Sequence, residues 1–362
     1  GEIMKTIGIM TTGGDCSGLN TVIQRIIRGA RLRKWRVIGI MDGTDGLCAT
    51  PPQIIELNDS VLPIENARLA GSFLHNGHAG VMNFETAAVQ GTLDKFNKKL
   101  RKSLQGLNLD ALILIGGNGS FSLAWGNREI YADLQLICVP KTIDMDIPLT
   151  DKTIGFDTAV WQLTTFCDQL MLTARSHHRW FVVQSMGRDC GALALHAGIA
   201  AGADVILIPE IKFDLDAVIS HVKNAVTDYG IIMVSEGVSL RGHSGRPADI
   251  ISRKLTAAGI ANRTAFPEHI QRAGDTTSAD RILATRFADC ALHAIENNET
   301  YVITALDGND VKTVSLADFF AAGEVSDDPK IPGLKTSDAY VSPDDPLLDV
   351  AHDMGIYIGE VK

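Results

Sequence analysis

Short apolar runs alternate with amphipathic stretches along most of this chain. Residues 5–10, 35–41, 111–115 and 136–139 form runs that are apolar over most of their length. Runs of this length are typical of parallel strands that are covered on both faces. Apolar residues recur at helical spacing over 21–33, and 84–104 is also predicted to be helical. The repeated order of strand, loop and helix predicts an α/β fold with a doubly wound sheet.

The same pattern returns in the second half of the chain. We expect strands at 180–184, 204–208, 230–235 and 301–306, and helices up to about 202, at 214–228 and at 280–296. Two domains with mainly parallel sheets follow from this repetition. The larger is predicted to span 1–155 plus 270–320, and the smaller 156–269 plus about 321–362. Residues 323–349 are rich in Asp and Pro and are predicted to be a surface segment.

Composition narrows the functional classes. The chain has 362 residues and a net charge of −10, which argues against nucleic acid or an anionic membrane as the main partner. Six cysteines occur without a C-x-x-C spacing, so neither a zinc site nor a thioredoxin-like motif is indicated. Cys138 and Cys290 stand in apolar runs and are predicted to be buried thiols. Without an apolar run of roughly 18 residues or a signal-like leader, we expect a cytoplasmic protein without a membrane span.

Two glycine-rich loops follow predicted strands. The first, TTGGDCSGLN at 11–20, contains Gly13 and Gly14 but matches neither the P-loop nor the dinucleotide fingerprint. Taken alone it also fits a tight turn between a strand and a helix. The second loop, GGNGS, follows the run at 111–115. Two such loops at the same edge of one sheet favour a nucleotide or polyphosphate site, because glycines let backbone amides approach a phosphate.

A third loop, PKTIDMD at 140–146, brings two carboxylates next to this edge. Asp144 and Asp146 are two residues apart, so in extended backbone they face the same side. Paired carboxylates beside phosphate loops suit a base for a sugar hydroxyl or a Mg²⁺ site. The alternative is a solvated acidic turn.

Polar groups also follow the later strands. Met186-Gly187-Arg188, Pro209-Glu210, Ser235-Glu236-Gly237 and the stretch from His269 to Arg272 stand in such places. A single surface arginine is more often a solvated or ion-paired residue. As a set, the arginines among these residues can supply positive charge suited to a phosphorylated substrate.

Seven motifs together resemble the phosphofructokinase family. TTGGDCSGLN, IGGNGS, PKTIDMD, TIGFDTA, MGRDCG, GADVILIPE and HIQRAG…DRILA occur in the family's order from residue 7 to about 290. The resemblance implies two Rossmann-like domains and a cytoplasmic, glycolytic kinase that moves the γ-phosphoryl group of ATP to the 1-hydroxyl of fructose 6-phosphate, giving fructose 1,6-bisphosphate. It also implies that Mg²⁺ accompanies the donor.

The resemblance also implies roles for individual residues. Asp144 is the expected base, with Thr142, Arg188 and Gly14 as further catalytic groups. The donor site is expected from Gly13, Gly14, His78, Gly117, Asn118, Gly119, Ser120 and Lys141. Mg²⁺ is expected at Asn118, Asp144 and Asp146. The sugar phosphate is expected at Thr142, Asp144, Met186, Gly187, Arg188, Glu236, His269 and Arg272. Arg179 and Arg263 match arginines that reach a neighbouring subunit's site, which implies a homodimer or homotetramer with shared active sites.

Four positions depart from the family's pattern. Asn118 replaces an aspartate, Met145 an asparagine, His78 an arginine, and Ala273 a glycine. A neutral amide is a poorer partner for Mg²⁺ than a carboxylate, and imidazole carries a full charge only below about pH 6.5. These changes bear on turnover and on the identity of the substrates.

The phosphoryl donor is a separate question. Gly119 is typical of ATP users, whereas Lys141 is typical of pyrophosphate users, and we expect ATP. The alternatives are a pyrophosphate-dependent phosphotransferase, acting on fructose 6-phosphate or on another sugar phosphate such as sedoheptulose 7-phosphate, and a non-catalytic member that regulates a partner subunit.

Overall fold

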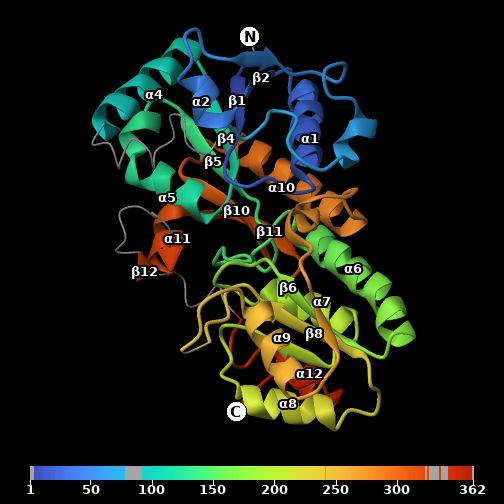
Figure 1. Ribbon diagram of the computed structural model, residues 1–362. Coiled ribbons are helices and arrows are strands. Elements are labelled where there is room, and N and C mark those ends of the chain that lie inside the picture. Colours follow the sequence, from blue (N-terminus) through green and yellow to red (C-terminus); the bar gives the residue numbers. More distant parts are fainter. Residues whose placement is uncertain are drawn as a thin grey trace. The chain divides into compact units, whose positions relative to one another are not determined.

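Figure 1 shows the computed structural model, which describes residues 4–77, 92–240, 242–322, 324–325, 334–335 and 341–360. The chain forms two compact units, each assembled from separate segments. The first comprises residues 1–142, 147–155 and 274–337, and the second comprises 143–146, 156–273 and 338–362. These boundaries differ from the expected ones, because 143–146 and 270–273 belong to the second unit and 321–337 to the first.

The first unit is built on a seven-stranded sheet in the order β11-β10-β5-β4-β1-β2-β3. The inner strands run parallel, and β3 and β11 pair antiparallel at the two edges. The strands are β1 (Thr6–Thr11), β2 (Arg36–Ile40), β3 (Ile54–Glu56), β4 (Ala111–Gly116), β5 (Gln135–Pro140), β10 (Val302–Asp307) and β11 (Asp310–Ser315). Because β5, β4 and β1 are neighbours, the loops that follow them start from one stretch of the sheet's carboxyl edge.

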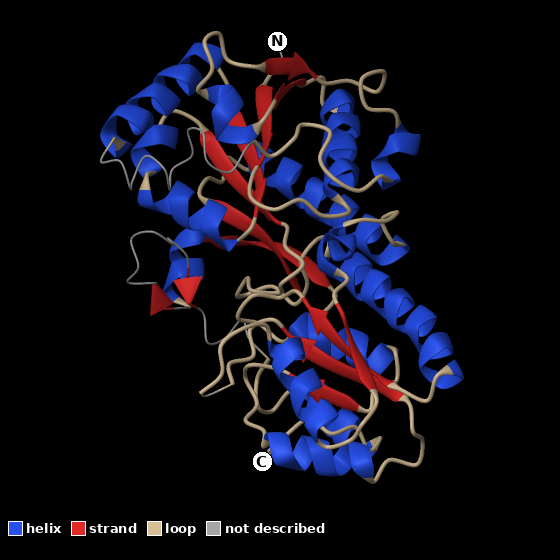
Figure 2. Ribbon diagram, viewed as in Figure 1, coloured by secondary structure: helices blue, strands red, loops and turns tan. Residues whose placement is uncertain are grey.

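Helices cover both faces of this sheet (Figure 2). One face carries α1 (Leu19–Leu32) and α10 (Ser278–Glu296). The other carries α2 (Gly43–Leu47), α4 (Leu93–Leu107), α5 (Asn118–Gly126) and α11 (Leu316–Ala321), whose apolar side chains join the strands in one buried core. Short 3₁₀ helices, η1 (Ile64–Arg68) and η2 (Arg128–Tyr131), and a pair of two-residue strands, β12 (Glu324–Val325) and β13 (Leu334–Lys335), complete the unit.

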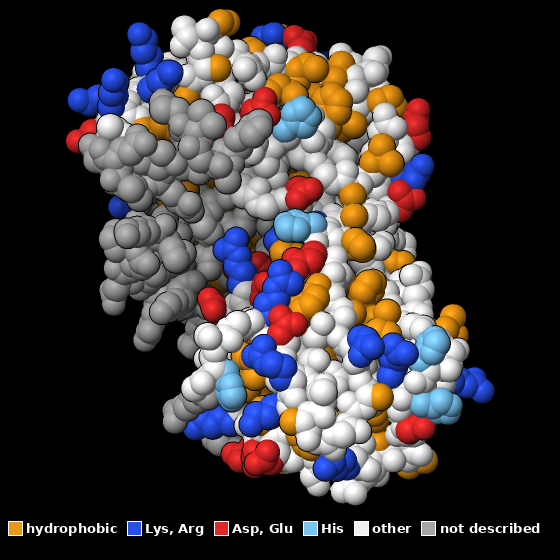
Figure 3. Space-filling view, in the orientation of Figure 1, with side chains coloured by type: hydrophobic (Ala, Val, Ile, Leu, Met, Phe, Trp, Pro, Cys, Tyr) orange, Lys and Arg blue, Asp and Glu red, His pale blue; other side chains and the backbone are white. Residues whose placement is uncertain are grey.

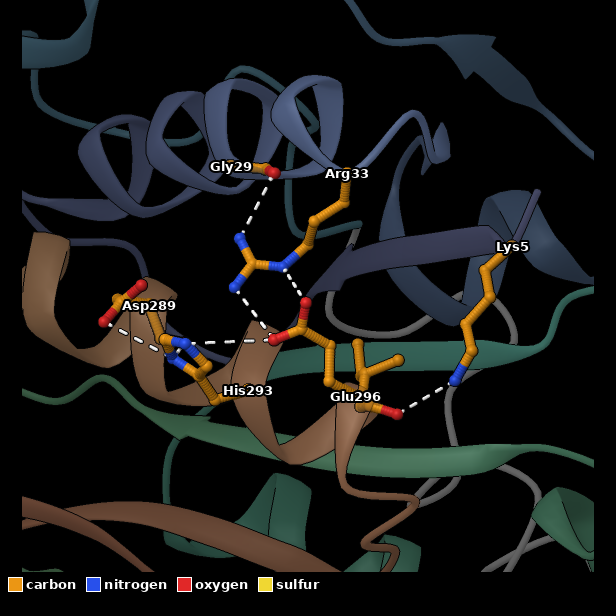
Figure 4. Close-up of polar contacts among 7 residues, drawn as sticks. Lys5, Gly29, Arg33, Asp289, His293 and Glu296 are labelled. Atoms are coloured by element: carbon orange, nitrogen blue, oxygen red, sulfur yellow. Dashed lines mark hydrogen bonds and ion pairs between the residues drawn. The ribbon is translucent and has the colours of Figure 1, made fainter. Parts of the chain in front are cut away.

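A polar network joins α1 to α10 (Figure 4). Arg33 donates to both carboxylate oxygens of Glu296, at 2.7 and 3.0 Å. His293 lies 3.8 Å from the same carboxylate and 3.5 Å from Asp289. The Lys5 ammonium donates to the Ile295 carbonyl oxygen at 2.9 Å. These contacts tie the start of β1 and the end of α1 to the end of α10.

The second unit has a smaller sheet in the order β7-β8-β6-β9, with every pair parallel. Its strands are β6 (Trp180–Ser185), β7 (Val205–Leu207), β8 (Gly230–Ser235) and β9 (Asn262–Ala265). Its helices are α6 (Phe156–Ser176), α7 (Ala192–Ala200), α8 (Leu215–Lys223), α9 (Pro247–Ala257) and α12 (Pro346–Asp353), with η3 (Glu268–Arg272) after β9. A buried cluster of side chains from the strands, α8 and α9 forms the core on one face.

The C-terminal segment belongs to this second sheet's edge. Tyr357 forms a parallel bridge with Val205, and its amide donates to the Asp204 carbonyl oxygen at 2.9 Å. The Glu360 amide donates to the Lys212 carbonyl oxygen at 2.8 Å. Residues that are far apart in sequence therefore complete one edge of the unit that is built around β6 and β8.

The α/β class with mainly parallel sheets is confirmed, while several local predictions need correction. The helix predicted at 84–104 begins at Leu93, and residues 84–91 lie outside the described residues. The helix predicted at 214–228 ends at Lys223. Cys138 is buried, but Cys290 is only partly buried. The antiparallel edge strands β3 and β11 were not predicted.

No helix among the described residues is long and apolar enough to cross a membrane. On the face drawn in Figure 3, acidic and basic side chains are interspersed among the described residues.

Candidate active site

The loop between β1 and α1 turns sharply and leaves Gly13 and Gly14 exposed. Gly13 has φ +76° and Gly18, which precedes α1, has φ +99°, in the region that favours glycine. The Thr12 amide donates to the Ile115 carbonyl oxygen at 3.0 Å, which ties this loop to β4. The Asn76 side chain donates to the Gly13 carbonyl oxygen at 2.8 Å. The loop is therefore fixed from both sides while the backbone at Gly13 and Gly14 faces solvent.

The loop after β4 meets this first loop directly. The Thr12 hydroxyl donates to the Ser120 hydroxyl oxygen at 2.8 Å. A Cβ on Gly116 would lie 2.6 Å from the Ser120 Cβ, so the close approach requires glycine. Helix α5 starts at Asn118, and a helix N-terminus favours negative charge because its first amides lack partners within the helix. The structure thus brings together the two predicted phosphate loops.

Lys141 connects the third loop to the first. Its side chain is 2% exposed, and its ammonium donates to the Thr12 carbonyl oxygen at 3.0 Å and to the Gly14 carbonyl oxygen. A buried ammonium needs such hydrogen bonds to offset its loss of hydration. Lys141 therefore braces the Gly13–Gly14 turn from below, and its positive charge lies close to both loops.

The exit of β5 is held by the segment 153–155. The Thr142 amide donates to the Ile154 carbonyl oxygen at 3.2 Å, and the Thr153 hydroxyl donates to the Thr142 carbonyl oxygen at 2.8 Å. The Gly155 amide in turn donates to the Asp280 carboxylate at 3.1 Å. Asp280 is 1% exposed at the start of α10. These bonds fix the backbone that leads from β5 to Asp144.

Asp144 is a buried carboxylate in the polar cluster of the second unit. Its side chain is 5% exposed. Burial raises the pKa of Asp144 to about 6, and the charges of Asp146 and Glu236 act in the same direction, while Arg188 and Arg272 act against it. The expected extended backbone is wrong, because Met145 has φ +56°. The two carboxylates are still close enough for Asp146 to affect the pKa of Asp144.

The loop at 186–191 carries the arginine that faces Asp144. The Arg188 Nε lies 3.7 Å from the Asp144 Oδ2. The Arg188 amide donates to Glu236 Oε1 at 2.9 Å, and the Met186 amide donates to Gln271 Oε1 at 3.1 Å. Arg188 itself has φ +51°, an uncommon conformation for a residue with a side chain. The predicted groups Met186, Arg188, Glu236 and Asp144 therefore form one cluster.

Helix η3 supplies the remaining cationic side chains of this cluster. The Arg272 charge lowers the pKa of Asp144, so the two side chains are within electrostatic reach. His269 lies on the same short helix and is exposed. An exposed imidazole on the same short helix as Arg272 suits an anionic ligand rather than an interior packing role.

Arg179 and Arg263 lie at the other end of the same sheet. Arg179 directly precedes β6, whereas Arg188 follows β6, and six strand residues at about 3.3 Å each separate these positions by roughly 20 Å. Arg263 sits on β9 beside Phe181, the second residue of β6. The structure therefore does not bring Arg179 and Arg263 together with the Arg188 cluster of the same chain.

Two predicted residues, His78 and Asn118, and two that were not predicted remain to be placed. His78 lies outside the described residues. Asn118 is 8% exposed at the first turn of α5, in the first unit, and its side-chain oxygen accepts from the Ser122 hydroxyl at 3.4 Å. Gln271 and Asp280 were missed, although Gln271 stands inside the HIQR motif and Asp280 inside DRILA. Each is a polar residue inside a motif whose other residues had been given roles, and this position was the signal that could have identified it.

The carboxylates fit a divalent cation. Among the described residues, no group of three or more His, Cys, Asp or Glu side chains forms a metal site by itself. The charge of Asp146 nevertheless raises the pKa of the buried Asp144, which shows that two negative charges are held close together. A hard dication bound through oxygen ligands and waters offsets such repulsion, as Mg²⁺ bound with phosphates does.

Comparisons with known proteins found relatives that match nearly the whole chain. The family model described as Phosphofructokinase matches residues 6–295. A protein of Nostoc sp. named ATP-dependent 6-phosphofructokinase 1 is 36% identical over 98% of this chain and 99% of its own length. The ATP-dependent 6-phosphofructokinase of Chloroflexus aurantiacus is 36% identical over 98% of each chain. A relative in Amycolatopsis mediterranei, named Pyrophosphate--fructose 6-phosphate 1-phosphotransferase, is 35% identical over 86% of this chain and 93% of its own.

Solved structures show the same fold. The T-state structure of Pichia pastoris phosphofructokinase matches 88% of this chain with a TM-score of 0.76 and 27% identity, while this chain spans 38% of that longer one. A pyrophosphate-dependent phosphofructokinase from Marinobacter aquaeolei matches 99% of this chain and 93% of its own with a TM-score of 0.75. At 18% identity, that second likeness concerns the fold alone.

Proposed function

Because the chain belongs to the phosphofructokinase family, we propose that it transfers the γ-phosphoryl group of ATP to the 1-hydroxyl of fructose 6-phosphate, with Asp144 as the base. The observation that carries the proposal is the buried Asp144 carboxylate, whose Oδ2 lies 3.7 Å from the Arg188 guanidinium. Phosphoryl transfer depends mainly on positioning and on charge stabilisation, and both units supply groups for these tasks.

The first unit would hold the donor. The exposed turn at Gly13 and Gly14 and the start of α5 offer backbone amides to phosphate oxygens. Lys141 braces the turn and adds positive charge beneath it. Gly117, Gly119 and Ser120 complete the expected donor residues. Because the loops are already joined through Thr12 and Ser120, little reorganisation is needed when the donor binds.

The second unit would hold the acceptor and activate it. Asp144 would take the proton of the 1-hydroxyl as that oxygen attacks the γ-phosphorus, with Thr142 nearby on the chain. A pKa of about 6 leaves Asp144 ionised at neutral pH and makes it a stronger base than an ordinary aspartate. Arg188 would stabilise charge on the moving phosphoryl group, while Met186, Gly187, Glu236, His269 and Arg272 would hold the sugar phosphate.

Asp144, Asp146 and Asn118 are the residues that would hold Mg²⁺. When bound, the ion supplies positive charge that offsets the charge on the donor's phosphate oxygens. Burial and the charge of Asp146 both raise the pKa of Asp144, and a nearby cation would offset both effects, which favours this assignment.

Pyrophosphate as the donor is the second candidate. A pyrophosphate-dependent relative is 35% identical to this chain, and Lys141 is the residue type expected of such enzymes. The Lys141 ammonium is committed to the carbonyl oxygens of Thr12 and Gly14. That arrangement supports a bracing role, which is compatible with ATP, and Gly119 leaves room for an α-phosphate.

Shared active sites are part of the proposal. Arg179 and Arg263 lie at the amino end of the smaller sheet, about one strand length from Arg188. Arginines in that place cannot reach the phosphate bound beside Arg188 of the same chain, so they would serve a neighbouring subunit. This interpretation predicts a homodimer or a homotetramer.

An activity assay that crosses ATP and pyrophosphate with fructose 6-phosphate and sedoheptulose 7-phosphate tests the function. The expected outcome is transfer from ATP to fructose 6-phosphate, with a turnover number reduced by at least about a hundredfold in Asp144→Asn. Transfer from pyrophosphate alone would mean that pyrophosphate, and not ATP, is the donor. Absence of turnover with every pair, in the presence of Mg²⁺, would favour a regulatory role.

A further inference from the structure

Three side chains from three different elements hold the loop at 186–191, which we call the arginine loop. Its amides at Met186, Arg188 and Gly191 donate to Gln271 Oε1 at 3.1 Å, Glu236 Oε1 at 2.9 Å and Glu210 Oε1 at 2.8 Å, respectively. Glu236 belongs to the proposed sugar-phosphate ligands. Glu210 does not, and the reaction described so far gives it no task.

The arginine loop needs such anchors because its backbone is strained. Arg188 has φ +51° and Gly187 has φ +130°. A residue with a Cβ pays a steric cost in the left-handed region, and it stays there only where its surroundings determine the conformation. A Cβ on Gly237 would lie 2.1 Å from the Arg188 carbonyl oxygen, so the neighbouring strand end also approaches this residue closely. The direction of the Arg188 side chain depends on this geometry.

Two backbone amides hold the Glu210 carboxylate in place. It follows β7, and the same Oε1 that accepts from Gly191 also accepts from the Val341 amide at 3.2 Å. A Cβ on Gly191 would lie 2.4 Å from the Ile208 Cβ and 2.5 Å from Glu210 Oε2, so only glycine permits this approach. Burial raises the pKa of Glu210, and a half-buried carboxylate is maintained at a cost that its hydrogen bonds offset.

We propose that Glu210 is a positioning residue for sugar-phosphate binding, which anchors the far end of the arginine loop and connects it through Val341 to the C-terminal segment. The proposal rests on the assignment of Arg188 to the sugar phosphate under the proposed function. Glu210 acts through the backbone of 188–191 and is not expected to touch the substrate.

The test compares substrate affinity with stability. Glu210→Ala removes the acceptor of two backbone amides, and we expect the KM for fructose 6-phosphate to rise by about tenfold or more. The KM for ATP should stay unchanged, because the donor residues are in the other unit. Glu210→Gln keeps a side-chain oxygen that can accept from both amides, so it should restore most of the affinity. Equal effects of the Ala and Gln variants, or equal changes in both KM values, would overturn the proposal.

A matched control separates positioning from general destabilisation. Asp214→Ala removes the N-cap of α8, where the carboxylate accepts from the Asp216 amide at 2.9 Å, in the same unit. It should lower the melting temperature but leave the KM for fructose 6-phosphate unchanged. If it raises that KM as much as Glu210→Ala does at a similar loss of stability, Glu210 has only a structural role.

Two further variants distinguish failure of the site assignment from failure of the positioning role. Arg188→Ala must itself raise the KM for fructose 6-phosphate; if it does not, the site assignment fails along with the inference. If Arg188→Ala has the effect and Glu210→Ala does not, only the positioning role is refuted. Where Glu210→Ala does not fold, Val341→Pro deletes one donor to the carboxylate. It should raise the KM by a smaller factor, and an unchanged KM would refute the link to the C-terminal segment.

Discussion

Replacing Asp144 with asparagine should make the protein more stable while it removes the base. Asp144 is 5% exposed, and its pKa in the folded chain is about 6 instead of the ordinary 3.8. The folded state therefore binds a proton more tightly than the unfolded state, so ionisation of Asp144 lowers the free energy of unfolding. The difference in pKa corresponds to about 3 kcal/mol, which is present in full above about pH 6. Asparagine keeps the shape of the side chain and removes this cost.

Thermal unfolding without metal or nucleotide measures the effect. For a chain of 362 residues, whose unfolding entropy is about 0.76 kcal/mol/K, a gain of about 3 kcal/mol should raise the melting temperature of Asp144→Asn by roughly 4 °C at about pH 8. The gain should fall to about half near pH 5 and fade as the pH approaches 4, because the wild-type carboxylate is then protonated in the folded state. Asp353→Asn, at an exposed carboxylate of the same unit, serves as the control and should show no such gain.

The reasoning fails if Asp144→Asn is no more stable than wild type at about pH 8, or if its advantage grows toward acid pH. Either result would mean that the surrounding arginines stabilise the ionised Asp144 more than burial and Asp146 oppose it. The pKa of Asp144 would then be ordinary or low, and its strength as a base would need another source.

Three further predictions concern the donor, the oligomer and the first unit's stability. Gly119→Asp should weaken use of ATP far more than use of pyrophosphate, because a carboxylate there repels the α-phosphate; equal losses in a two-donor assay would contradict this. Mixing Asp144→Asn subunits with Arg263→Ala subunits should restore part of the activity, and hybrids without recovery would refute shared sites. Arg33→Ala should lower the free energy of unfolding by about 1 kcal/mol through loss of the paired contacts to Glu296, an effect that high salt should reduce; denaturant unfolding at two salt concentrations checks it.

Much of the fold could be predicted from the sequence because buried parallel strands leave a strong signal. The apolar runs at 111–115 and 230–235 correspond to β4 and β8 with nearly the same bounds. The edge strands β3 (IIE) and β11 (DVKTVS) were not predicted, because their sequences mix polar and apolar residues. Pairing with a neighbouring strand specifies them instead. Each unit comprises three segments of the chain instead of the two that were predicted, because the assignment of 143–146 and 147–155 depends on tertiary contacts, which periodicity does not report.

The candidate site likewise has features that could be predicted from the sequence and features that could not. Motif residues such as Asp144 and Arg188 could be predicted because their types and spacing suit the chemistry. The backbone at Met145 could not, since a positive φ in a non-glycine residue is imposed by the surroundings. Glu210 stood in a recognised motif, but its task depends on an amide at Gly191 and another at Val341. Partners separated by so many residues are visible only in the folded chain.

The discontinuous second unit has a consequence for biosynthesis. Its sheet edge at β7 is completed by Tyr357, whose amide and carbonyl groups pair with Asp204 and Ile206. A ribosome releases these residues long after β6 and β8 have emerged, so the unit that carries Arg188 must wait in an incomplete state while the rest of the chain is made. We therefore expect nascent chains that end before the Tyr357 segment to be held by chaperones or degraded.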